Sequence, residues 1–369
     1  MSCFRTLIIL IFCLAAGGSA AAVRPEMVRV ALMKGAETLR IDGDGVLLTD
    51  GRGEPLRVEM PLEVRREGSG LTVNGKGVSR LVASAFSRIT VNGKGYRALI
   101  EVFPAEKGLL VVNELPLEEY LVGLINCEIS SAWPIEAIKA QAVIARSYAM
   151  YQMQARRGAI YQLESSVMDQ VYEGADVEDN RAAFGVRETA GEVLTYDGKA
   201  IQAFYHSNCA GHTESSRNVW GLSIPYLQGV PCRYCGEANP IKWELNLPLR
   251  KVEASLKSAG FQVAGLKELR ARGRNQSGRV QDVAAECSRG TVLIPGVAFR
   301  KALGYGTVKS TNFELRTGRD EVRVAGTGSG HGVGLCQWGA KGRANEGFDY
   351  REILAYYYPG VKLAGGYGR

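Results

Sequence analysis

Long apolar runs are absent from this sequence after about its first twenty residues, so no later segment predicts a membrane-spanning helix. Residues 1–22 have a different pattern. Arg5 supplies a positive charge, Leu7–Ala16 is an apolar run too short to span a bilayer, and Gly17–Ala22 is rich in small residues. We therefore expect a signal peptide at residues 1–22 and an exported protein, located in the periplasm or cell envelope. A retained membrane anchor is the alternative interpretation.

A basic stripe interleaved with aromatic residues, which is typical of nucleic-acid-binding surfaces, is also missing. The net charge is +7, but the Lys and Arg residues are spread along the chain, and such a diffuse positive surface suits an anionic polymer. The glycine-rich run Gly326–Ala340 fits neither GxGxxG nor the Lys-Ser/Thr pair of a phosphate loop, which argues against a nucleotide site. Its glycines let the backbone come close to a ligand or another chain segment.

The length of 369 residues suits two domains, and 46% apolar with 22% charged residues is ordinary globular composition. From Val28 to about Glu114, apolar and polar residues alternate with β-branched content, which predicts strands. A short repeat reads LTVNGKG at residues 71–77 and ITVNGKG at residues 89–95. The Asn-Gly pairs favour tight turns, so we expect two similar hairpins in one small sheet or barrel.

Two helices with a tight corner between them are predicted over Leu115–Tyr151. Pro116 and Pro134 stand where proline favours a helix start, and apolar residues recur at helical spacing. Glu128 lies in the corner, shortly before Trp133. Partly apolar surroundings would raise the pKa of this carboxyl, and a carboxyl that stays protonated near neutral pH can act as a general acid. A helix-capping or salt-bridged acid is the alternative.

Histidine is scarce. His206, His212 and His331 each lie among Gly, Ser, Cys or Asn in a turn-rich stretch, and none lies on an apolar helical face. Functional groups concentrate on such loops, although ordinary surface or core histidines remain the alternative.

Six cysteines remain after the predicted signal peptide. Cys209 and His212 are separated by two residues, as are Cys232 and Cys235, and these four predict a closed structural zinc site. His206 is a further candidate ligand. Four protein ligands leave no open coordination position, so such a zinc would hold structure and would not activate water. A Cys232–Cys235 or Cys209–Cys232 disulfide is the alternative in an oxidising compartment.

Four ordered motifs resemble the stage II sporulation protein D (SpoIID) and LytB amidase-enhancer family. They are LPLEEYLVGLINCEISSAWPIEAIKAQAVIARSYAM, DQVYEG, FYHSNCAGHTE followed by VWG, and GSGHGVGLCQWGAKG ending in YREILAYYYPG. The resemblance implies an α+β fold, in which a SpoIID-type catalytic domain at residues 92–363 combines a helical pair with a mixed β-sheet. We expect an inserted α/β subdomain at about 241–313, a small all-β region at 23–91 and a tail at 364–369.

The resemblance implies a peptidoglycan lytic transglycosylase with Glu128, in the interhelical position, as its catalytic acid. Glycosidic hydrolysis normally uses two carboxylates, whereas a transglycosylase can use one, so neither water nor a cofactor is required for the chemistry. The expected partner is the glycan strand, with a cell-wall amidase in addition. The residues expected to shape the groove or bind sugar are Gln141, Arg146, Tyr148, Gln170, Tyr172, His206, Ser207, His331 and Gln337.

Two other functions remain open from the sequence. The chain could be a non-catalytic wall-binding module that stimulates an amidase, or a structural scaffold that carries zinc. Some family members resemble zinc proteins with ligands just before the QVY motif, but Met168 and Asp169 offer no His or Cys there, so that site is not expected. Sporulation does not follow from the resemblance.

Overall fold

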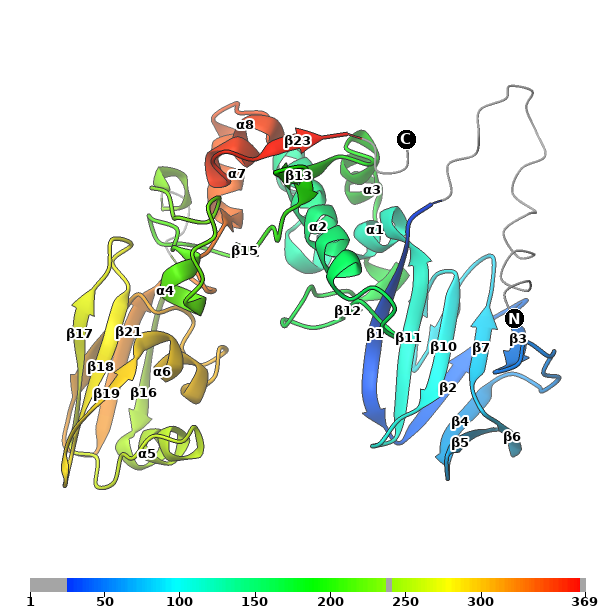
Figure 1. Ribbon diagram of the computed structural model, residues 1–369, viewed down its shortest axis with the longest axis horizontal. Coiled ribbons are helices and arrows are strands. Elements are labelled where there is room, and N and C mark those ends of the chain that lie inside the picture. The colour runs from blue at the N-terminus through cyan, green and yellow to red at the C-terminus, as the bar shows by residue number, and fades with distance from the viewer. Residues whose placement is uncertain (1–24, 237–240, 366–369) are drawn as a thin grey trace.

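The computed structural model describes residues 25–236 and 241–365. The expected signal peptide and the last four residues of the expected tail lie outside the described residues. The chain forms an arch (Figure 1). A β-rich N-terminal part and a lobe of residues 242–327 are its two legs, and a layer of helices joins them at the top. The α+β class expected from the sequence is confirmed.

Two six-stranded sheets form the N-terminal leg. The first has the order β12 (Leu163–Glu164), β1 (Met27–Ala36), β11 (Leu109–Pro116), β10 (Leu99–Pro104), β7 (Leu81–Ser84) and β3 (Leu47–Asp50). The second has the order β6 (Lys76–Val78), β5 (Gly70–Val73), β4 (Leu62–Glu67), β2 (Thr38–Asp42), β8 (Ile89–Val91) and β9 (Lys94–Tyr96). Alternate residues are buried along β4, β5, β7 and β8, so the strands present their apolar sides to one shared core.

The sequence repeat forms two similar hairpins in one sheet, as predicted. β5 and β6 turn at Asn74-Gly75, with φ values of 46° and 82°, and β8 and β9 turn at Asn92-Gly93, with φ values of 49° and 85°. Positive φ at both central residues is the condition for a type I′ hairpin turn. The hairpins lie at opposite ends of the second sheet. The domain boundary expected at 91/92 falls inside the second turn.

The predicted helical pair is present as α1 (Leu117–Glu128) and α2 (Ile135–Ala155), with Pro116 and Pro134 at their N-caps. α2 is buried on most sides because two cores share it. Ile138, Ala142 and Ala145 belong to the core of the N-terminal leg, whereas Ala140 and Val143 belong to a second core beyond the helix. Small alanines let neighbours approach α2 closely from both sides.

The second core lies at the top of the arch. It gathers α2, a three-stranded sheet, a two-stranded sheet and two C-terminal helices. The elements from residue 174 onward that lie outside the lobe are η1 (Gly174–Val177), α3 (Asn180–Glu188), β13 (Val193–Tyr196), β14 (Lys199–Ala200), β15 (Tyr205–His206), α4 (Ser216–Trp220), η2 (Arg233–Cys235), β22 (Leu335–Cys336), α7 (Gln337–Asn345), α8 (Tyr350–Tyr357) and β23 (Lys362–Ala364). Of these, α3 packs on the core of the N-terminal leg.

The other leg is a lobe with its own apolar core. Its elements are β16 (Lys242–Pro248), α5 (Leu249–Ser258), β17 (Glu268–Arg274), β18 (Val280–Cys287), β19 (Gly290–Pro295), α6 (Gly296–Leu303), β20 (Phe313–Thr317) and β21 (Glu321–Thr327). α5 starts directly after Pro248, which stands at its N-cap. The lobe continues past residue 313, where we expected the insertion to end, because β21 pairs with β16 along its whole length, from Lys242↔Thr327 to Pro248↔Glu321.

Within the described ranges, no helix combines the length and the apolar character needed to cross a bilayer.

Gly123 sets the distance between α1 and the segment before α3. A Cβ added at Gly123 would lie 2.7 Å from the carbonyl oxygen of Gly174 and 2.8 Å from the ring of Tyr172. We expect Gly123→Ala to destabilise the protein by about 1–3 kcal/mol, because this overpacking outweighs the better helix propensity of alanine. Urea unfolding measures the loss. Gly77→Ala is the matched control, since nothing lies within 4 Å of that position. Equal stability of the two variants would contradict the close packing of α1.

Candidate active site

Glu128 is the last residue of α1 and faces the corner between the helices, as predicted. The helix ends there because the next residue, Ile129, is extended, with φ −140° and ψ 163°, although its N–H still bonds to the carbonyl of Ile125. Ile129 is buried and Glu128 is half-buried. Part of the Glu128 residue therefore remains accessible to solvent.

Three groups donate hydrogen bonds to the Glu128 carboxyl. The backbone N–H of Val171 lies 3.1 Å from Oε1. The side chains of Tyr205 and Gln337 also bond to this carboxyl. These hydrogen bonds favour the charged form, but burial has the larger effect and raises the pKa of Glu128 above its ordinary value. The structure therefore favours a protonated Glu128 beyond the pH range of an exposed glutamate.

Parallel pairing of β15 with β22 brings Tyr205 and Gln337 together. Tyr205 pairs with Leu335 and His206 pairs with Cys336, although about 130 residues separate the two strands in the sequence. α7 begins directly after β22, so Gln337 is its first residue. The carbonyl of Ser207 accepts a hydrogen bond from the backbone N–H of Trp338, at 3.1 Å, and extends the pairing by one step.

Gln170 fixes the Tyr205 hydroxyl. Its Nε2 lies 3.3 Å from Tyr205 Oη, and its Oε1 accepts a hydrogen bond from Tyr120 Oη at 3.2 Å. Gln170 is 1% exposed, and the next residue, Val171, supplies the N–H that bonds to Glu128. The segment predicted from the DQVYEG motif thus reaches the carboxyl twice, through a backbone N–H and through Tyr205.

Gln141 reaches the site from α2. Its Oε1 accepts a hydrogen bond from Gln337 Nε2 at 3.3 Å, whereas its own Nε2 is buried and has no partner among the described residues. An unsatisfied buried donor costs about 1–3 kcal/mol, so an acceptor on a bound ligand would relieve this cost. Gln141 therefore retains a role as a ligand-binding candidate.

His206 and His331 lie side by side, with ring centroids 5.7 Å apart. His206 Nδ1 lies 3.1 Å from the carbonyl oxygen of Val333, and His331 Nδ1 accepts the backbone N–H of Val333 at 3.0 Å. Burial lowers the pKa of His206 well below its ordinary value and lowers the pKa of His331 to about 3. Both rings are neutral at neutral pH, and His206 Nε2 is buried without a partner in the described part of the chain.

Three of the expected groove residues bind other parts of the protein instead. The Arg146 guanidinium is fully buried and forms two hydrogen bonds, 2.7 and 2.8 Å long, with the Glu118 carboxylate. Tyr148 Oη donates to Asp169 at 2.9 Å, and Tyr172 Oη donates to an Asn113 side chain at 2.9 Å. These contacts hold α1, α2 and the DQVYEG segment in place, which gives the three residues a supporting position around the site.

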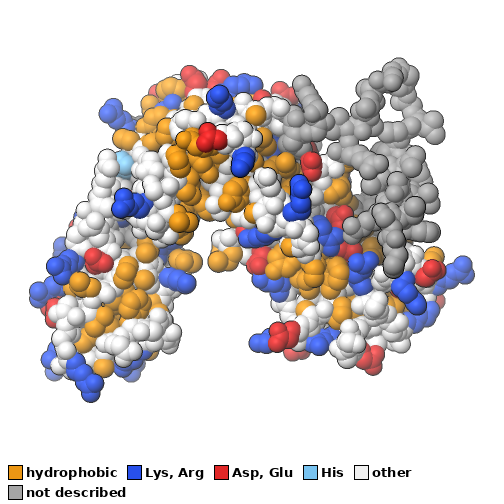
Figure 2. All heavy atoms as spheres, in the orientation of Figure 1, with side chains coloured by type: hydrophobic (Ala, Val, Ile, Leu, Met, Phe, Trp, Pro, Cys, Tyr) orange, Lys and Arg blue, Asp and Glu red, His pale blue; other side chains and the backbone are white. Residues whose placement is uncertain are grey.

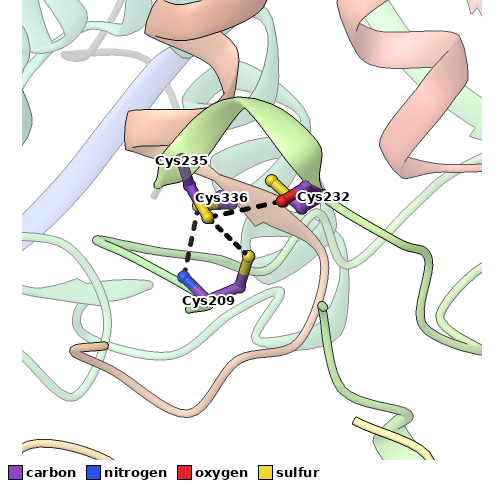
Figure 3. A group of neighbouring side chains, drawn as sticks. All are labelled: Cys209, Cys232, Cys235 and Cys336. Carbon is purple, nitrogen blue, oxygen red and sulfur yellow. Dashed lines mark hydrogen bonds between the residues drawn. The ribbon is translucent and has the colours of Figure 1, made fainter. Parts of the chain in front are cut away.

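Four buried cysteines lie next to the carboxyl-binding strands: Cys209, Cys232, Cys235 and Cys336. All four sulfur atoms lie within 4.8 Å of one another, and Cys209 Sγ and Cys235 Sγ are 3.4 Å apart. Figure 3 shows the side chains converging from the loop after β15, both ends of η2 and the end of β22. Tetrahedral zinc with bonds of about 2.3 Å places its sulfur ligands about 3.8 Å apart, which this spacing matches. No disulfide joins any cysteines of the described residues.

Cys336 takes the place that we expected for His212. The turn at Ala210 and Gly211, with φ values of 60° and 107°, carries His212 past the cluster, and its Nδ1 lies 2.6 Å from the carbonyl oxygen of Thr213. The prediction of Cys209, Cys232 and Cys235 as neighbours agrees with the structure. Cys336 was missed because it lies far along the chain, in the glycine-rich motif.

The cluster has the surroundings of a thiolate site. Backbone N–H groups point at two of the sulfurs: Gly211 at Cys235, at 3.2 Å, and Gly339 at Cys336, at 3.3 Å. Hydrogen bonds from neighbouring thiols lower the pKa of Cys235. The buried guanidinium of Arg279, from the lobe, donates to the Cys209 carbonyl at 3.0 Å and so brings positive charge close to the sulfurs. Groups that donate hydrogen bonds or bring positive charge to sulfur are typical neighbours of metal-bound thiolates.

Comparison with known proteins places this arrangement in a family. The model of a family described as Stage II sporulation protein (SpoIID) matches residues 105–196. The chain is 34% identical over 297 residues to an uncharacterized protein of Brachyspira hyodysenteriae, covering 80% of this chain and 79% of that relative. It is 30% identical over 277 residues to stage II sporulation protein D of Bacillus subtilis, covering 69% of this chain and 76% of that relative.

The chain belongs to the SpoIID family. A protein of Bacillus subtilis named amidase enhancer is 29% identical over 66% of this chain, which corresponds to 40% of that relative's length. A second model, for a domain of unknown function (DUF8618), matches residues 237–334 and so includes the lobe.

The SpoIID segment contains Glu128, Gln141 and Gln170, whereas Tyr205 and Gln337 follow it in the sequence. All four cysteines of the cluster lie outside both matched ranges. The cluster therefore joins the two stretches of this SpoIID protein that flank the lobe, one before it and one after it.

The raised pKa of Glu128 predicts a pH-dependent stability difference. Because the folded pKa lies above the ordinary value of 4.5, the native state holds a proton that the unfolded state releases as the pH rises. This stabilisation is complete below the unfolded pKa and is lost as pH rises through the folded pKa. Thermal unfolding should therefore show Glu128→Gln gaining stability relative to wild type between pH 4 and pH 8. The same measurement on Glu106→Gln, at an exposed position, gives the effect of removing one surface charge. This effect is subtracted from the stability change measured for Glu128→Gln. A difference that is constant with pH would contradict a desolvated acid.

Proposed function

We propose that this SpoIID protein is an exported lytic transglycosylase that cleaves the bond between N-acetylmuramic acid and N-acetylglucosamine in glycan strands, including strands already stripped of stem peptides. The supporting observation is Glu128, a partly exposed residue whose carboxyl is held by three donors and whose pKa burial raises above its ordinary value. Among the described residues, no second carboxylate is one of the groups that act on its pKa. Hydrolysis with two carboxylates fits this arrangement less well than transglycosylation with one.

The proposed reaction needs one proton and no water. The Glu128 carboxyl gives its proton to the glycosidic oxygen as the bond from C1 of the muramic acid breaks. The C6 hydroxyl of the same sugar then attacks C1 and closes a 1,6-anhydro ring. Its proton returns to the Glu128 carboxylate, which restores the enzyme. Tyr205 and Gln337 stabilise the carboxylate between the two proton transfers.

The shape of the molecule suits a polymeric substrate. Figure 2 shows a broad hollow between the two legs, with hydrophobic side chains gathered on the underside of the helical layer. A strand can pass through an open hollow without a free end, which a closed pocket would not allow. Gln141 Nε2 and His206 Nε2, two buried nitrogens that have no partner among the described residues, are our candidates for binding the sugar. Ser207, which is half-buried beside them, is a further candidate.

The relatives support a role at the cell wall and raise one rival function. Two relatives carry the name stage II sporulation protein D and one the name amidase enhancer. If this protein acts as an amidase enhancer, it would bind the cell wall without cleaving it and would stimulate a cell-wall amidase. The enhancer function gives the Glu128 carboxyl no role in chemistry, so we prefer the lytic transglycosylase. An exported location agrees with both functions.

Glu128→Gln tests the enzyme directly. Purified wild-type protein incubated with glycan strands free of stem peptides should release products with 1,6-anhydro ends, identified by mass spectrometry. Glu128→Gln should lower the rate at least about a hundredfold, because it removes the transferable proton and keeps the side-chain shape. Glu119→Gln, on the exposed side of the same helix, should retain activity. Uncleaved strands that bind wild type and are cut faster by an added amidase would favour the enhancer function.

We further propose that Cys209, Cys232, Cys235 and Cys336 hold a structural zinc ion. Four buried sulfur atoms that all lie within 4.8 Å of one another fit a closed tetrahedral site. When bound, zinc would fix the strand ends that carry Tyr205 and Gln337, since Cys209 follows the first and Cys336 precedes the second. The buried Arg279 offsets part of the negative charge of the thiolates. The chemistry at Glu128 uses no metal.

Metal analysis of purified variants tests the zinc site and its fourth ligand. We expect one equivalent of zinc in wild type, and its loss in Cys336→Ser as in Cys232→Ser. His212→Ala should retain zinc, because His212 lies outside the cluster. Zinc loss in His212→Ala but not in Cys336→Ser would contradict the proposed ligand set. Absence of metal together with fewer titratable thiols would show a disulfide instead.

A further inference from the structure

Trp220 is exposed beside the candidate active site. It ends the short helix α4, and Gly221, in the left-handed conformation with φ 76°, terminates the helix directly after it. Its side chain is 40% exposed, and the following Leu222 is 65% exposed. Large apolar side chains at such exposure are unremarkable when scattered singly, but here they form part of a cluster of rings.

Three rings form this cluster, which we call the aromatic platform: Phe204, Trp220 and His331. The Phe204 and Trp220 centroids are 4.4 Å apart, with their planes inclined by 35°. His331 lies 5.3 Å from Trp220 and 5.9 Å from Phe204. Tyr148 packs against Phe204, with the two ring centroids 6.0 Å apart. The platform is therefore supported on its inner side, while Trp220 keeps part of its surface open to solvent.

The platform is fixed relative to the Glu128 carboxyl. Phe204 directly precedes Tyr205, which bonds to that carboxyl. His331 is anchored at both ring nitrogens, because Nδ1 accepts the Val333 N–H and the ring also bonds to the backbone carbonyl of Tyr205. A sugar held on the platform would thus have a defined position relative to the acid.

The chemistry of the platform selects its ligand. One face of a pyranose ring presents C–H bonds with a small positive charge, and the face of an aromatic ring is electron-rich. Stacking of the two buries apolar surface and leaves the hydroxyl groups at the edge free to bind water or protein. His331 carries no charge at neutral pH, so all three rings are neutral. The apolar C–H face of a sugar ring matches this surface, and the charged or polar groups at the edge of the sugar can stay in water.

We propose that the aromatic platform is a sugar-binding subsite, at which Trp220 stacks on one residue of the glycan strand next to the bond that is cleaved. The proposal rests on the proposed function, because it takes the glycan strand as the ligand. It concerns binding alone, so it can be tested in a protein that does not cleave.

Binding to an uncleaved strand tests the subsite. Glu128→Gln is mixed with soluble oligosaccharides made of alternating N-acetylglucosamine and N-acetylmuramic acid, and affinity is measured by calorimetry. Adding Trp220→Ala should weaken binding about tenfold, whereas Trp220→Phe, which keeps an aromatic face, should restore most of it. Phe86→Ala is the matched control, since Phe86 is 80% exposed on the N-terminal leg. It should leave affinity unchanged.

Tryptophan fluorescence gives a second reading. The sequence has four tryptophans, so a stacked sugar should change the emission of Glu128→Gln, and Trp220→Phe should remove most of that change. Unchanged affinity in Trp220→Ala would overturn the subsite, even if wild type cleaves strands. A weakened Trp220→Ala together with an inactive wild type would support the subsite and overturn the lytic function. If Glu128→Gln binds no oligosaccharide, the subsite proposal fails, and the release of anhydro ends by wild type then decides the lytic function separately.

Discussion

The structure of the site depends on one short parallel pairing, that of β15 with β22. Only two residue pairs form it, Tyr205 with Leu335 and His206 with Cys336. It brings Tyr205 and the start of α7 to the Glu128 carboxyl, and it brings Cys209 and Cys336 into one cluster. The whole lobe lies between the two strands in the sequence, so this contact must close a long loop. Closing such a loop is entropically costly, which explains why further bonds reinforce the pairing.

The electrostatic character of the site follows from burial without charge pairing. Glu128 is surrounded by neutral donors, His206 and His331 are neutral, and the ion pair between Arg146 and Glu118 lies in the supporting network. A nearby cation would lower the pKa of Glu128 and remove its proton. Neutral hydrogen-bond donors hold the carboxyl in place, while desolvation raises its pKa. This combination suits a group that first gives a proton and then takes one back.

The sequence predicts the parts of the fold that depend on local signals. The helical pair follows from Pro116, Pro134 and helical spacing, and the two hairpins follow from their Asn-Gly turns. The sequence does not predict contacts between residues that are far apart in the chain. The lobe extends further than expected because β21 pairs with β16. Cys336 was missed because only cysteines and histidines close together in the sequence were considered as ligands. Tyr205 was missed although it stands beside His206 in a recognised motif, because only the strand pairing shows that it meets Glu128.

Cleavage in water enriched in oxygen-18 tests the central claim, a single protonated Glu128 that transfers the glycosidic bond to a hydroxyl of the substrate. Glycan strands free of stem peptides are incubated with the wild-type protein, and the new ends are analysed by mass spectrometry. A transglycosylase with one carboxyl group should give anhydro ends that lack one water and contain no heavy oxygen. Reducing ends that carry one heavy oxygen would show hydrolysis and would contradict it.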